Sequence, residues 1–563
     1  MVDLNSTKLE DILKLLIGIV LVVWINMLSS MYFERFDLTE EQRYTIKPAT
    51  KELLKNLDDK VFIEVYLDGE LNASFKRLQR SIRETLDEFR VYSDNKIQFS
   101  FKDPGAALNE KARGEFMQGL IARGIQPTNV IDERDGQRLE KLIFPGAVVS
   151  YGGAESGVML LQGNKSSTAE EKINQSIEGI EYALASTIQG LTKLERKSLG
   201  IVRGHNELDD LEMASLLNEL NANYSLSMID LATKVDPFDA LLIAKPKTAF
   251  TESEKYYLDQ YLMQGGKIFL LIDQIQASMD SASNVANYSF PYQLNLDDQL
   301  FKYGIRINND LIQDNSAASY PVNVGNMGDQ PQIKLMKWWF FPLINRFGDH
   351  VITRNLDAVL GRFVSSIDTV KAVGVKKTPL LFTSDYSRTL TSPVNVSLQD
   401  LRKTVTPEML NKQHIPIAYL LEGEFQSLYK NRFKPESVND DTFIEHSKES
   451  AKLLVVSDGD LARNDVNPRT GSPQALGYDP FTRNTYANQT FILNALNYLV
   501  DDKGLITARN KEIKIRPLDK VKISNERTKW QLINLVIPIL LLIGYGVIRY
   551  YLRKRKYTGY KTD

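Results

Sequence analysis

The chain of 563 residues contains no cysteine. This absence excludes disulfide bonds, thiolate metal sites, iron–sulfur clusters and a catalytic thiol, because each of them requires cysteine sulfur. A cysteine-free chain is also compatible with an oxidising compartment outside the cytoplasm. Composition alone therefore rules out several classes of enzyme.

Signature motifs of common hydrolases are missing as well. There is no GxxxxGK[ST] phosphate-binding loop, and the glycine pair before Lys267 is typical of the end of a helix. No GxSxG nucleophile elbow occurs, and the histidines show neither HxxxH nor HExxH spacing. The four histidines are His205, His350, His414 and His446. The sequence therefore predicts no catalytic, cofactor-binding or metal-ligating residue.

Charge of either sign is not in excess, since 69 Lys and Arg face 71 Asp and Glu for a formal net charge of -2. Such a chain has no global basic field for a phosphate backbone, so nucleic acid is not expected as a partner. Apolar residues make up 43% of the chain. At this length and apolar content we expect two or three packed domains.

Two long uncharged stretches, Leu15–Phe33 and Trp530–Ile548, lie near the ends of the chain. Each would form a helix of about 28 Å, which nearly matches the hydrocarbon core of a bilayer. A cleaved signal peptide is the alternative for the first stretch, but no clear small-x-small cleavage site follows it. A buried core helix is the alternative for the second. We therefore predict two transmembrane helices.

The orientation of these helices follows from the basic residues beside them. A dense basic cluster follows the second stretch and consists of Arg549, Arg553, Lys554, Arg555 and Lys556. The positive-inside rule places this cluster in the cytoplasm, although basic residues between Lys520 and Lys529 compete with it. Two spans put both termini on one side. The sequence thus predicts a membrane protein whose bulk lies on the side opposite to the cytoplasm.

The segment after the first stretch reads as a small α/β module. Strand patterns at Val61–Gly69 and Lys96–Pro104 enclose a helix with apolar residues at steps of three and four. A second helical pattern covers Asn109–Arg123, and a closing pair of strands follows it. This βαβαββ order resembles a thioredoxin-like module. Without cysteine, a redox role for the module is excluded.

A longer region with short apolar runs follows a linking helix. Leu199–Gly204, Asp239–Pro246, Lys267–Asp273 and Lys452–Ala462 are bounded by turn residues or separated by helical patterns. Continuous apolar runs are typical of parallel strands that are covered on both faces. We therefore predict a doubly wound, flavodoxin-like α/β domain with a large insertion at about 274–450.

The predicted organisation divides the chain into eight consecutive segments. They are a cytoplasmic N-terminus (1–14), a transmembrane helix (15–33), the thioredoxin-like module (34–170), a linking helix (171–196), the α/β domain (197–510), a membrane-proximal stalk (511–529), a second transmembrane helix (530–548) and a basic cytoplasmic tail (549–563).

Polar residues follow two of the predicted strands, where doubly wound folds place ligand sites. His205 and Glu207 follow the first strand, and Asp458 and Asp460 follow the last one. A histidine base or a cation site is one interpretation. The favoured interpretation is structural: turns for the aspartates, and a turn with a helix cap at Asn206 for the histidine segment.

One stretch within the predicted insertion, Lys337–Pro342, is unusually aromatic. Burial in a local core is the preferred interpretation, and an exposed interaction patch is the alternative.

Several stretches together closely resemble the gliding-associated GldG family. They include FDLTEEQRYTIKPATKELLKNL, IVRGHNEL, LLIAKPKTAFTESEKYYLDQYLMQGGKIFLLID, PYQLNLDDQLFKYGIRIN, VVSDGDLARNDV and LGYDPFTRNTYANQTFILNALNYLVDD. The resemblance implies an inner-membrane protein of Bacteroidota that serves as the auxiliary or putative substrate-binding component of an ABC transporter. It further implies a GldF-like permease and a GldA-like ATPase as partners, and a link to gliding motility.

The same resemblance implies an ABC-transporter auxiliary domain related to class I amidotransferase-like folds and to a domain of intraflagellar transport proteins. Class I amidotransferases act through a cysteine nucleophile, which this chain lacks. We therefore expect a non-enzymatic subunit that binds cargo or couples permease motion to envelope partners. A membrane-tethered scaffold without transport coupling, and an envelope enzyme built on His205, Glu207, Asp458 and Asp460, are the alternatives.

Overall fold

The computed structural model describes most of the chain, and its two compact units, Met1–Lys511 and Glu512–Asp563, are treated separately below. The described residues are 7–31, 45–106, 109–134, 137–162, 168–192, 196–232, 235, 237–282, 288–328, 330–402, 405–438, 442–448, 451–501, 504–510 and 520–557.

The first predicted membrane segment is helical as far as it is described. Helix α1 spans Thr7–Met31, and residues 32 and 33 of the predicted span lie outside the described residues. Leu13–Met27 is the apolar part of this helix among the residues whose side chains are described, and the uncharged sequence continues beyond it to Phe33. Transmembrane insertion of this helix therefore stays a prediction.

The N-terminal module is built around a four-stranded sheet with the order β2-β1-β5-β6. Strand β1 is parallel to β2 and antiparallel to β5, which is antiparallel to β6. The elements are α2 (Pro48–Lys55), β1 (Val61–Val65), α3 (Ala73–Tyr92), β2 (Ile97–Phe101), α4 (Glu110–Ala122), β3 (Thr128–Arg134), β4 (Gln137–Ile143), β5 (Gly146–Tyr151), β6 (Ala154–Met159) and α5 (Ala169–Thr192).

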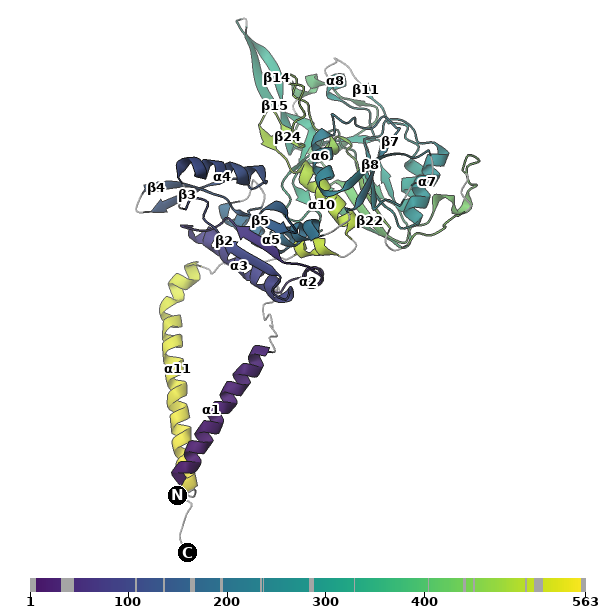
Figure 1. The fold of residues 1–563 in the computed structure, drawn as a ribbon. Helices are drawn as coiled ribbons and strands as arrows, with labels where there is room; N and C mark the ends of the chain where they lie inside the picture. The colour runs from purple at the N-terminus through teal and green to yellow at the C-terminus, as the bar shows by residue number, and fades with distance from the viewer. Residues whose placement is uncertain are drawn as a thin grey trace. The chain divides into compact units, whose positions relative to one another are not determined.

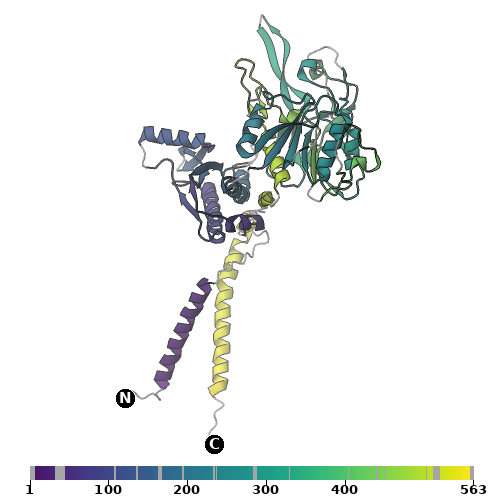
Figure 2. The ribbon, with the colours of Figure 1, turned by 45° about the vertical axis from the view of Figure 1, so that its right-hand side comes forward.

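Helices cover both faces of this sheet (Figure 2). Helix α3 begins where the Asn72 side chain accepts a hydrogen bond from the backbone N–H of Phe75 at 3.0 Å, a standard N-cap. Its apolar side packs with α5 in one core, and Leu120 of α4 packs on Val148 in a second, smaller core. The predicted helical period of α3 is thereby confirmed.

The module differs from the predicted βαβαββ order by one extra hairpin. Strands β3 and β4 pair antiparallel between α4 and β5, and their residues carry many charges. The sequence contained one indication of this hairpin, the dipeptide Asp135–Gly136, because Asp-Gly favours two-residue hairpin turns. The thioredoxin-like assignment itself stays a prediction.

The larger region contains an eight-stranded sheet with the order β16-β19-β22-β23-β10-β9-β7-β8. Figure 1 labels its strands β7, β8 and β22. Its strands are β7 (Ser198–Arg203), β8 (Ser225–Asp230), β9 (Ala240–Ala244), β10 (Lys267–Leu271), β16 (Arg346–Phe347), β19 (Val375–Phe382), β22 (Pro416–Gly423) and β23 (Lys452–Val456). The five strands from β8 to β23 are parallel, and the other three add antiparallel pairs.

Neighbouring residues of the parallel strands point into two different cores. Leu242 of β9 packs with helices α6 (Ala214–Asn223) and α10 (Asn488–Val500), whereas Leu241 and Ile243 pack with α7 (Glu252–Met263). Because both faces are covered, these strands read as continuous apolar runs rather than alternating ones. A mixed α/β fold with a central parallel sheet is thus confirmed, and the amidotransferase-like assignment stays a prediction.

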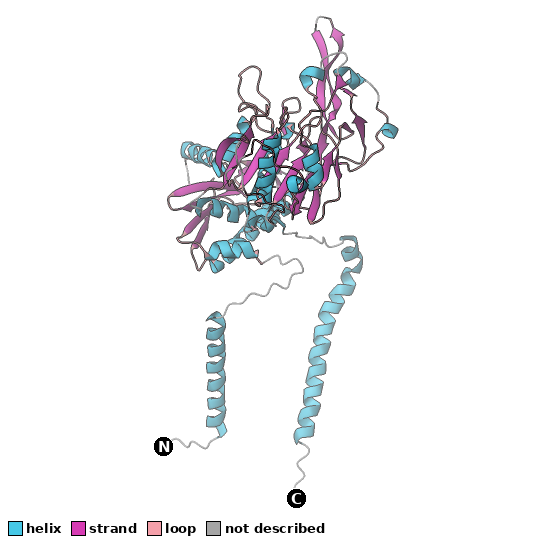
Figure 3. Ribbon diagram, turned by 90° about the vertical axis from the view of Figure 1, so that its right-hand side faces the viewer, coloured by secondary structure: helices cyan, strands magenta, loops and turns pink. Residues whose placement is uncertain are grey.

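The region predicted as an insertion does not stay apart from this sheet. Its strands β16, β19 and β22 extend the sheet in antiparallel fashion. Elsewhere it forms a long hairpin of β14 (Ala317–Met327) and β15 (Gln330–Ile344), which Figure 3 shows as paired magenta strands. The sequence contained no signal for which strands would pair, because such long-range pairing depends on the whole fold.

The aromatic stretch Lys337–Pro342 lies in β15 and contributes to a local core. Trp338 is 1% exposed and Phe340 is fully buried, and their rings make an edge-to-face contact at 5.2 Å. The preferred interpretation of this stretch is confirmed.

The carboxyl-terminal unit consists of one long helix, α11 (Lys520–Tyr557). Its segment Ile523–Arg555 is long and apolar enough to cross a membrane, and in the part of the chain that is described no other helix meets both conditions. Predicted residues 530–548 lie inside it. The residues 511–519 of the predicted stalk and 558–563 of the tail lie outside the described residues.

Candidate functional site

The carboxyl ends of three adjacent parallel strands bring charged side chains together. Lys245 directly follows β9, Asp273 comes two residues after β10, and Asp458 and Asp460 follow β23. The register aligns these ends, because Leu271 of β10 pairs with both Ala244 and Val456. The parallel sheet thus turns three separate strand ends into one cluster.

Lys245 is the centre of this cluster. Its Nζ lies 2.8 Å from Oδ2 of Asp273 and 2.5 Å from Oδ1 of Asp460. The backbone N–H of Gly459 donates to Oδ1 of Asp273 at 2.5 Å. Lys245 is 6% exposed, and the two aspartates are buried with it. A buried ammonium between two carboxylates is held by both Coulomb attraction and hydrogen bonds.

The backbone is shaped to allow this close approach. A Cβ atom at Gly459 would lie 2.6 Å from Cβ of Lys245, so a larger residue would collide there. Lys245 itself has a φ of 57°, a left-handed conformation that is uncommon for lysine. Strain of this kind persists only where the surrounding contacts fix it.

Two arginines extend the cluster. The Arg362 guanidinium contacts Asp465 at 2.9 and 2.7 Å, and its backbone N–H donates to Oδ2 of Asp458 at 2.8 Å. Arg463 lies 3.5 Å from Asp460. We call the seven side chains the Lys245 cluster: Lys245, Asp273, Arg362, Asp458, Asp460, Arg463 and Asp465.

The carboxyl groups of the cluster are not electrostatically equal. Burial and the nearby charges of Asp273 and Asp460 raise the pKa of Asp458 well above its ordinary value. Burial also opposes ionisation of Asp460, but Lys245 and Arg463 outweigh it and lower the pKa of Asp460. Burial also raises the pKa of Asp273, although its contacts with Lys245 and with the backbone N–H of Gly459 oppose this rise.

A cation site is the first chemical possibility for this arrangement. One oxygen each from Asp273, Asp458 and Asp460 lies within 4.8 Å of the others, and Oδ1 of Asp458 has no hydrogen-bond partner among the described residues. Carboxylate oxygens suit Mg²⁺ or Ca²⁺. However, Lys245 already supplies the positive charge, and a metal ion would have to displace a buried ion pair. The geometry therefore fits a closed structural cluster.

A second charged group follows β7 at the same edge of the sheet. Nδ1 of His205 lies 3.3 Å from Glu207, and Nε2 lies 3.4 Å from Glu254. The imidazole ring stacks on the Phe250 ring, with ring centres 3.7 Å apart and an interplanar angle of 13°. The backbone carbonyl of His205 accepts a hydrogen bond from the backbone N–H of Lys247 at 2.7 Å. We call His205, Glu207, Glu254 and Phe250 the His205 group.

The surroundings of His205 favour its protonated form. Burial lowers the pKa of His205, but the hydrogen bonds and charges of Glu207 and Glu254 outweigh burial and raise it overall. The pKa of Glu207 is lowered for the reciprocal reason. A protonated imidazole between two carboxylates resembles a structural ion pair more than a free catalytic base.

The helix cap predicted at Asn206 is wrong. No helix begins there: α6 starts at Ala214, and Asn206 adopts a left-handed φ of 53°. Gly204, with a φ of 120°, makes the predicted turn. The local residues were read correctly as turn formers, but the following helix starts later than the sequence pattern indicated.

The enzyme alternative required His205, Glu207, Asp458 and Asp460 to share one pocket. The structure places all four at one sheet edge but divides them, since the contacts described for His205 and Glu207 lead to Glu254 and those of the aspartates lead to the Lys245 cluster. The sequence prediction missed Lys245 and Asp273, although each follows a predicted strand.

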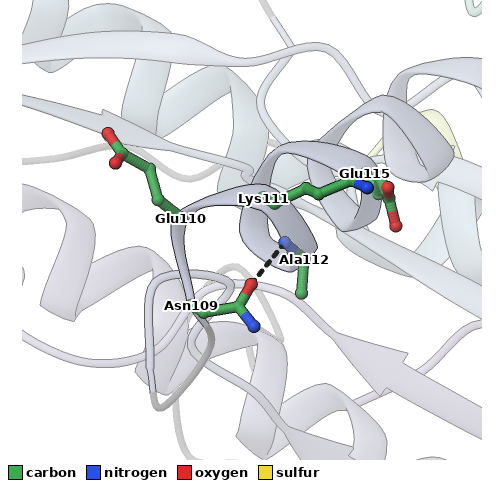
Figure 4. A pocket seen from close by; sticks show the side chains of 5 residues that line it. All are labelled: Asn109, Glu110, Lys111, Ala112 and Glu115. Atoms are coloured by element: carbon green, nitrogen blue, oxygen red, sulfur yellow. Dashed lines mark hydrogen bonds between the residues drawn. The ribbon is translucent and has the colours of Figure 1, made fainter.

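A separate pocket of about 410 Å³ lies beside the first turn of α4 (Figure 4). It is lined by Asn109, Glu110, Lys111, Ala112 and Glu115, which all belong to one segment. Asn109 caps the helix by accepting a hydrogen bond from the backbone N–H of Ala112 at 2.8 Å. Side chains from a single exposed turn do not enclose a ligand, so this pocket is a poor candidate for a binding site.

The fold and site together define a mixed α/β protein in which paired, buried side chains fill the carboxyl edge of the parallel strands. One of its helices is long and apolar enough to cross a membrane. A family model for auxiliary components of ABC transporters, ABC_transp_aux, described as "ABC-type uncharacterized transport system", matches residues 196–495. This match covers more than half of the chain. The chain belongs to this family, which supports membrane association and association with transporter components.

Further comparisons concern the whole chain and its N-terminal module. A domain of unknown function, DUF7088, matches residues 40–150. An uncharacterized protein of Borreliella burgdorferi is 23% identical over 565 residues, which cover 98% of this chain and 99% of the relative. A solved mmIFT52 N-terminal domain is 14% identical, with a TM-score of 0.31 over 54% of this chain and 98% of that domain.

Proposed function

We propose that the chain is a non-catalytic auxiliary subunit of an ABC-type transport complex in the bacterial cytoplasmic membrane. The family match over residues 196–495 carries this proposal. Helix α11 provides one membrane anchor, and helix α1, which contains most of the predicted span 15–33, provides the second. The basic residues after α11 favour cytoplasmic termini and a periplasmic bulk.

The closed sheet edge supports a binding or mechanical role over a catalytic one. In open α/β folds the usual ligand crevice lies at the carboxyl ends of the strands. Here the Lys245 cluster and the His205 group fill those positions with paired, buried side chains. Such a domain acts through its outer surface, by engaging cargo or by transmitting the motion of a permease.

The finer proposal follows the resemblance to the GldG family. A GldF-like permease and a GldA-like ATPase would complete the complex, and gliding motility would be the process that it serves. Because the chain has no phosphate-binding loop of its own, another subunit must hydrolyse ATP.

Purification of the native complex in mild detergent tests this function. We expect the full chain to bring down an ATPase and a permease in a fixed ratio, and ATPase activity to change when the chain is stripped away. A matched variant in which the α11 sequence is replaced by an unrelated apolar helix should stay in the membrane, and its retention or loss of the permease shows whether α11 takes part in binding. Recovery of the wild-type chain alone would overturn the proposal in favour of a tethered scaffold.

A further inference from the structure

One side of α3 in the N-terminal module carries a stripe of basic residues. Lys76, Arg80, Arg83 and Arg90 recur at steps of four, three and seven, and all four are exposed. Residues at these spacings share one face of a helix. The opposite face is buried in the module core. The helix therefore presents a predominantly cationic surface to solvent.

Three of these four cations have no acidic partner among the described residues. Arg90 pairs with Asp87 at 2.5 Å. By contrast, Lys76, Arg80 and Arg83 make no ion pair with any residue in the described ranges. Charges that the fold leaves uncompensated remain available to an external anion.

Aromatic rings lie directly beneath several of the cations. The Arg83 guanidinium lies 4.2 Å from the ring centre of Phe101, and that of Arg90 lies 5.3 Å from Phe99. Both rings belong to β2, an edge strand of the module sheet. Stacking holds the guanidinium groups at the surface and keeps their long side chains ordered.

Helix α2 extends the same surface. Nζ of Lys51 lies 4.5 Å from the ring centre of Tyr92, the last residue of α3, and α2 and α3 pack together in the module (Figure 1). We call this region the basic–aromatic corner: Lys51, Lys76, Arg80, Arg83, Arg90, Tyr92, Phe99 and Phe101. Cations beside aromatic rings are the chemistry found at the headgroup level of membranes.

The chain connects this module to both apolar helices by short segments. Residues 32–47 join α1 to α2, and residues 511–519 join the short helix η5 (Leu505–Asn510) to α11. Leu505 of η5 belongs to the module core. Fully extended, the two connections reach at most about 55 Å and about 35 Å. A module tethered at two points near a bilayer meets its headgroups at a high effective concentration.

We propose that the basic–aromatic corner docks on the anionic headgroups of the membrane in which the chain is anchored. The proposal rests on the membrane anchorage of the proposed function. The attraction between each cation and an anionic surface is weak, so the stripe can orient a module that is already tethered but cannot anchor a free one. Docking would fix the module against the bilayer and hold the α/β domain in a defined position for its transporter partners.

The cysteine-free chain allows a direct test by site-specific labelling. Ala73→Cys places a single fluorophore at the exposed start of α3 on the same face as the stripe. The full chain is reconstituted in nanodiscs that contain headgroup-spin-labelled lipid as a quencher. We expect about twofold stronger quenching with phosphatidylglycerol than with phosphatidylcholine alone, and its loss at high salt.

Two triple variants distinguish the corner from general surface charge. Lys76→Gln/Arg80→Gln/Arg83→Gln should abolish the difference between the two lipids. The control, Lys371→Gln/Lys434→Gln/Arg469→Gln, removes three exposed cations of the α/β domain and should preserve it. Unchanged circular dichroism and unfolding midpoints show that both variants are folded.

Equal quenching in both lipids, or an unchanged signal in the corner variant, would overturn the proposal. Loss of a co-purifying protein from the corner variant, without any lipid dependence, would assign the corner to an acidic protein surface instead. Failure of the membrane anchorage is recognised separately, because the chain would then be removed from native membranes by alkaline carbonate.

Discussion

The Lys245 cluster and the His205 group both fill the carboxyl edge of the sheet with buried ion pairs, but they do so with different side chains. The Lys245 cluster joins lysine and arginine to aspartates, and its cations stay charged across the physiological pH range. The His205 group depends on one imidazole, whose pKa the neighbouring Glu207 and Glu254 raise above its ordinary value. The ion pairs of the Lys245 cluster therefore persist across this pH range, whereas those of the His205 group depend on pH. Both groups lie beyond adjacent strands of one sheet.

The largest effect is expected from Lys245→Met. This change keeps the side-chain volume but leaves Asp273 and Asp460 without their shared cation, which should destabilise the α/β domain by about 3–5 kcal/mol. Denaturant titration of the full chain in detergent measures the shift in midpoint. Lys371→Met, at an exposed position, is the control and should shift stability by less than about 0.5 kcal/mol. Similar midpoints for the two variants would contradict a stabilising role of these ion pairs.

Two aspartate variants test whether Asp458 and Asp460 contribute differently to the stability of the Lys245 cluster. Asp460→Asn removes an ionised partner of Lys245 and should cost about 1–3 kcal/mol. Asp458→Asn replaces a carboxyl whose pKa is raised by burial and by the charges of Asp273 and Asp460, so it should lower the midpoint less than Asp460→Asn does. The same denaturant titration compares the two, and equal losses would show that Asp458 is ionised in the folded chain.

The pH dependence of stability distinguishes the His205 group from the Lys245 cluster. Because the folded-state pKa of His205 is raised, its contribution is complete below the unfolded pKa of about 6.5 and is lost as pH rises through the folded pKa. The unfolding midpoint should therefore fall with rising pH in this window, and His205→Gln should flatten the slope. His414→Gln, at an exposed position, serves as the control. An unchanged slope in His205→Gln would refute the assignment.

A smaller effect than that of Lys245→Met is expected at the start of α7, which presents Glu254 to His205. Thr251 and Glu254 form a capping box, with the Thr251 backbone N–H donating to Glu254 at 2.7 Å. Thr251→Ala should cost about 1 kcal/mol and weaken the pH dependence that His205 causes. Ser253→Ala, two residues along the same turn, tests whether any change in this turn has the same effect. Melting curves at two pH values measure both variants.

The sequence predicted the individual elements of the parallel sheet well. Apolar runs such as Asp239–Pro246 and Lys267–Asp273 enclose β9 and β10, because burial on both faces imposes a continuous apolar pattern. It also predicted the apolar helix at 530–548, since bilayer thickness fixes the length of such a run. It did not predict that β19 and β22 join the same sheet.

The candidate site could be predicted only in part. Asp458 and Asp460 were recognised as residues that follow a strand, and the same reasoning applied to Lys245 and Asp273 would have found them. Arg362 had no such signal, because it reaches Asp458 and Asp465 from about 100 positions earlier in the chain.

The sequence by itself determined what this chain lacks and approximately where its apolar elements lie, because composition, hydrophobic period and run length are local properties. Only the tertiary structure decided that Lys245 lies between Asp273 and Asp460, and that His205 pairs with Glu254 rather than with the aspartates. These partners come from different strands and helices, so the register of the sheet and the packing of α7 determine which charges meet.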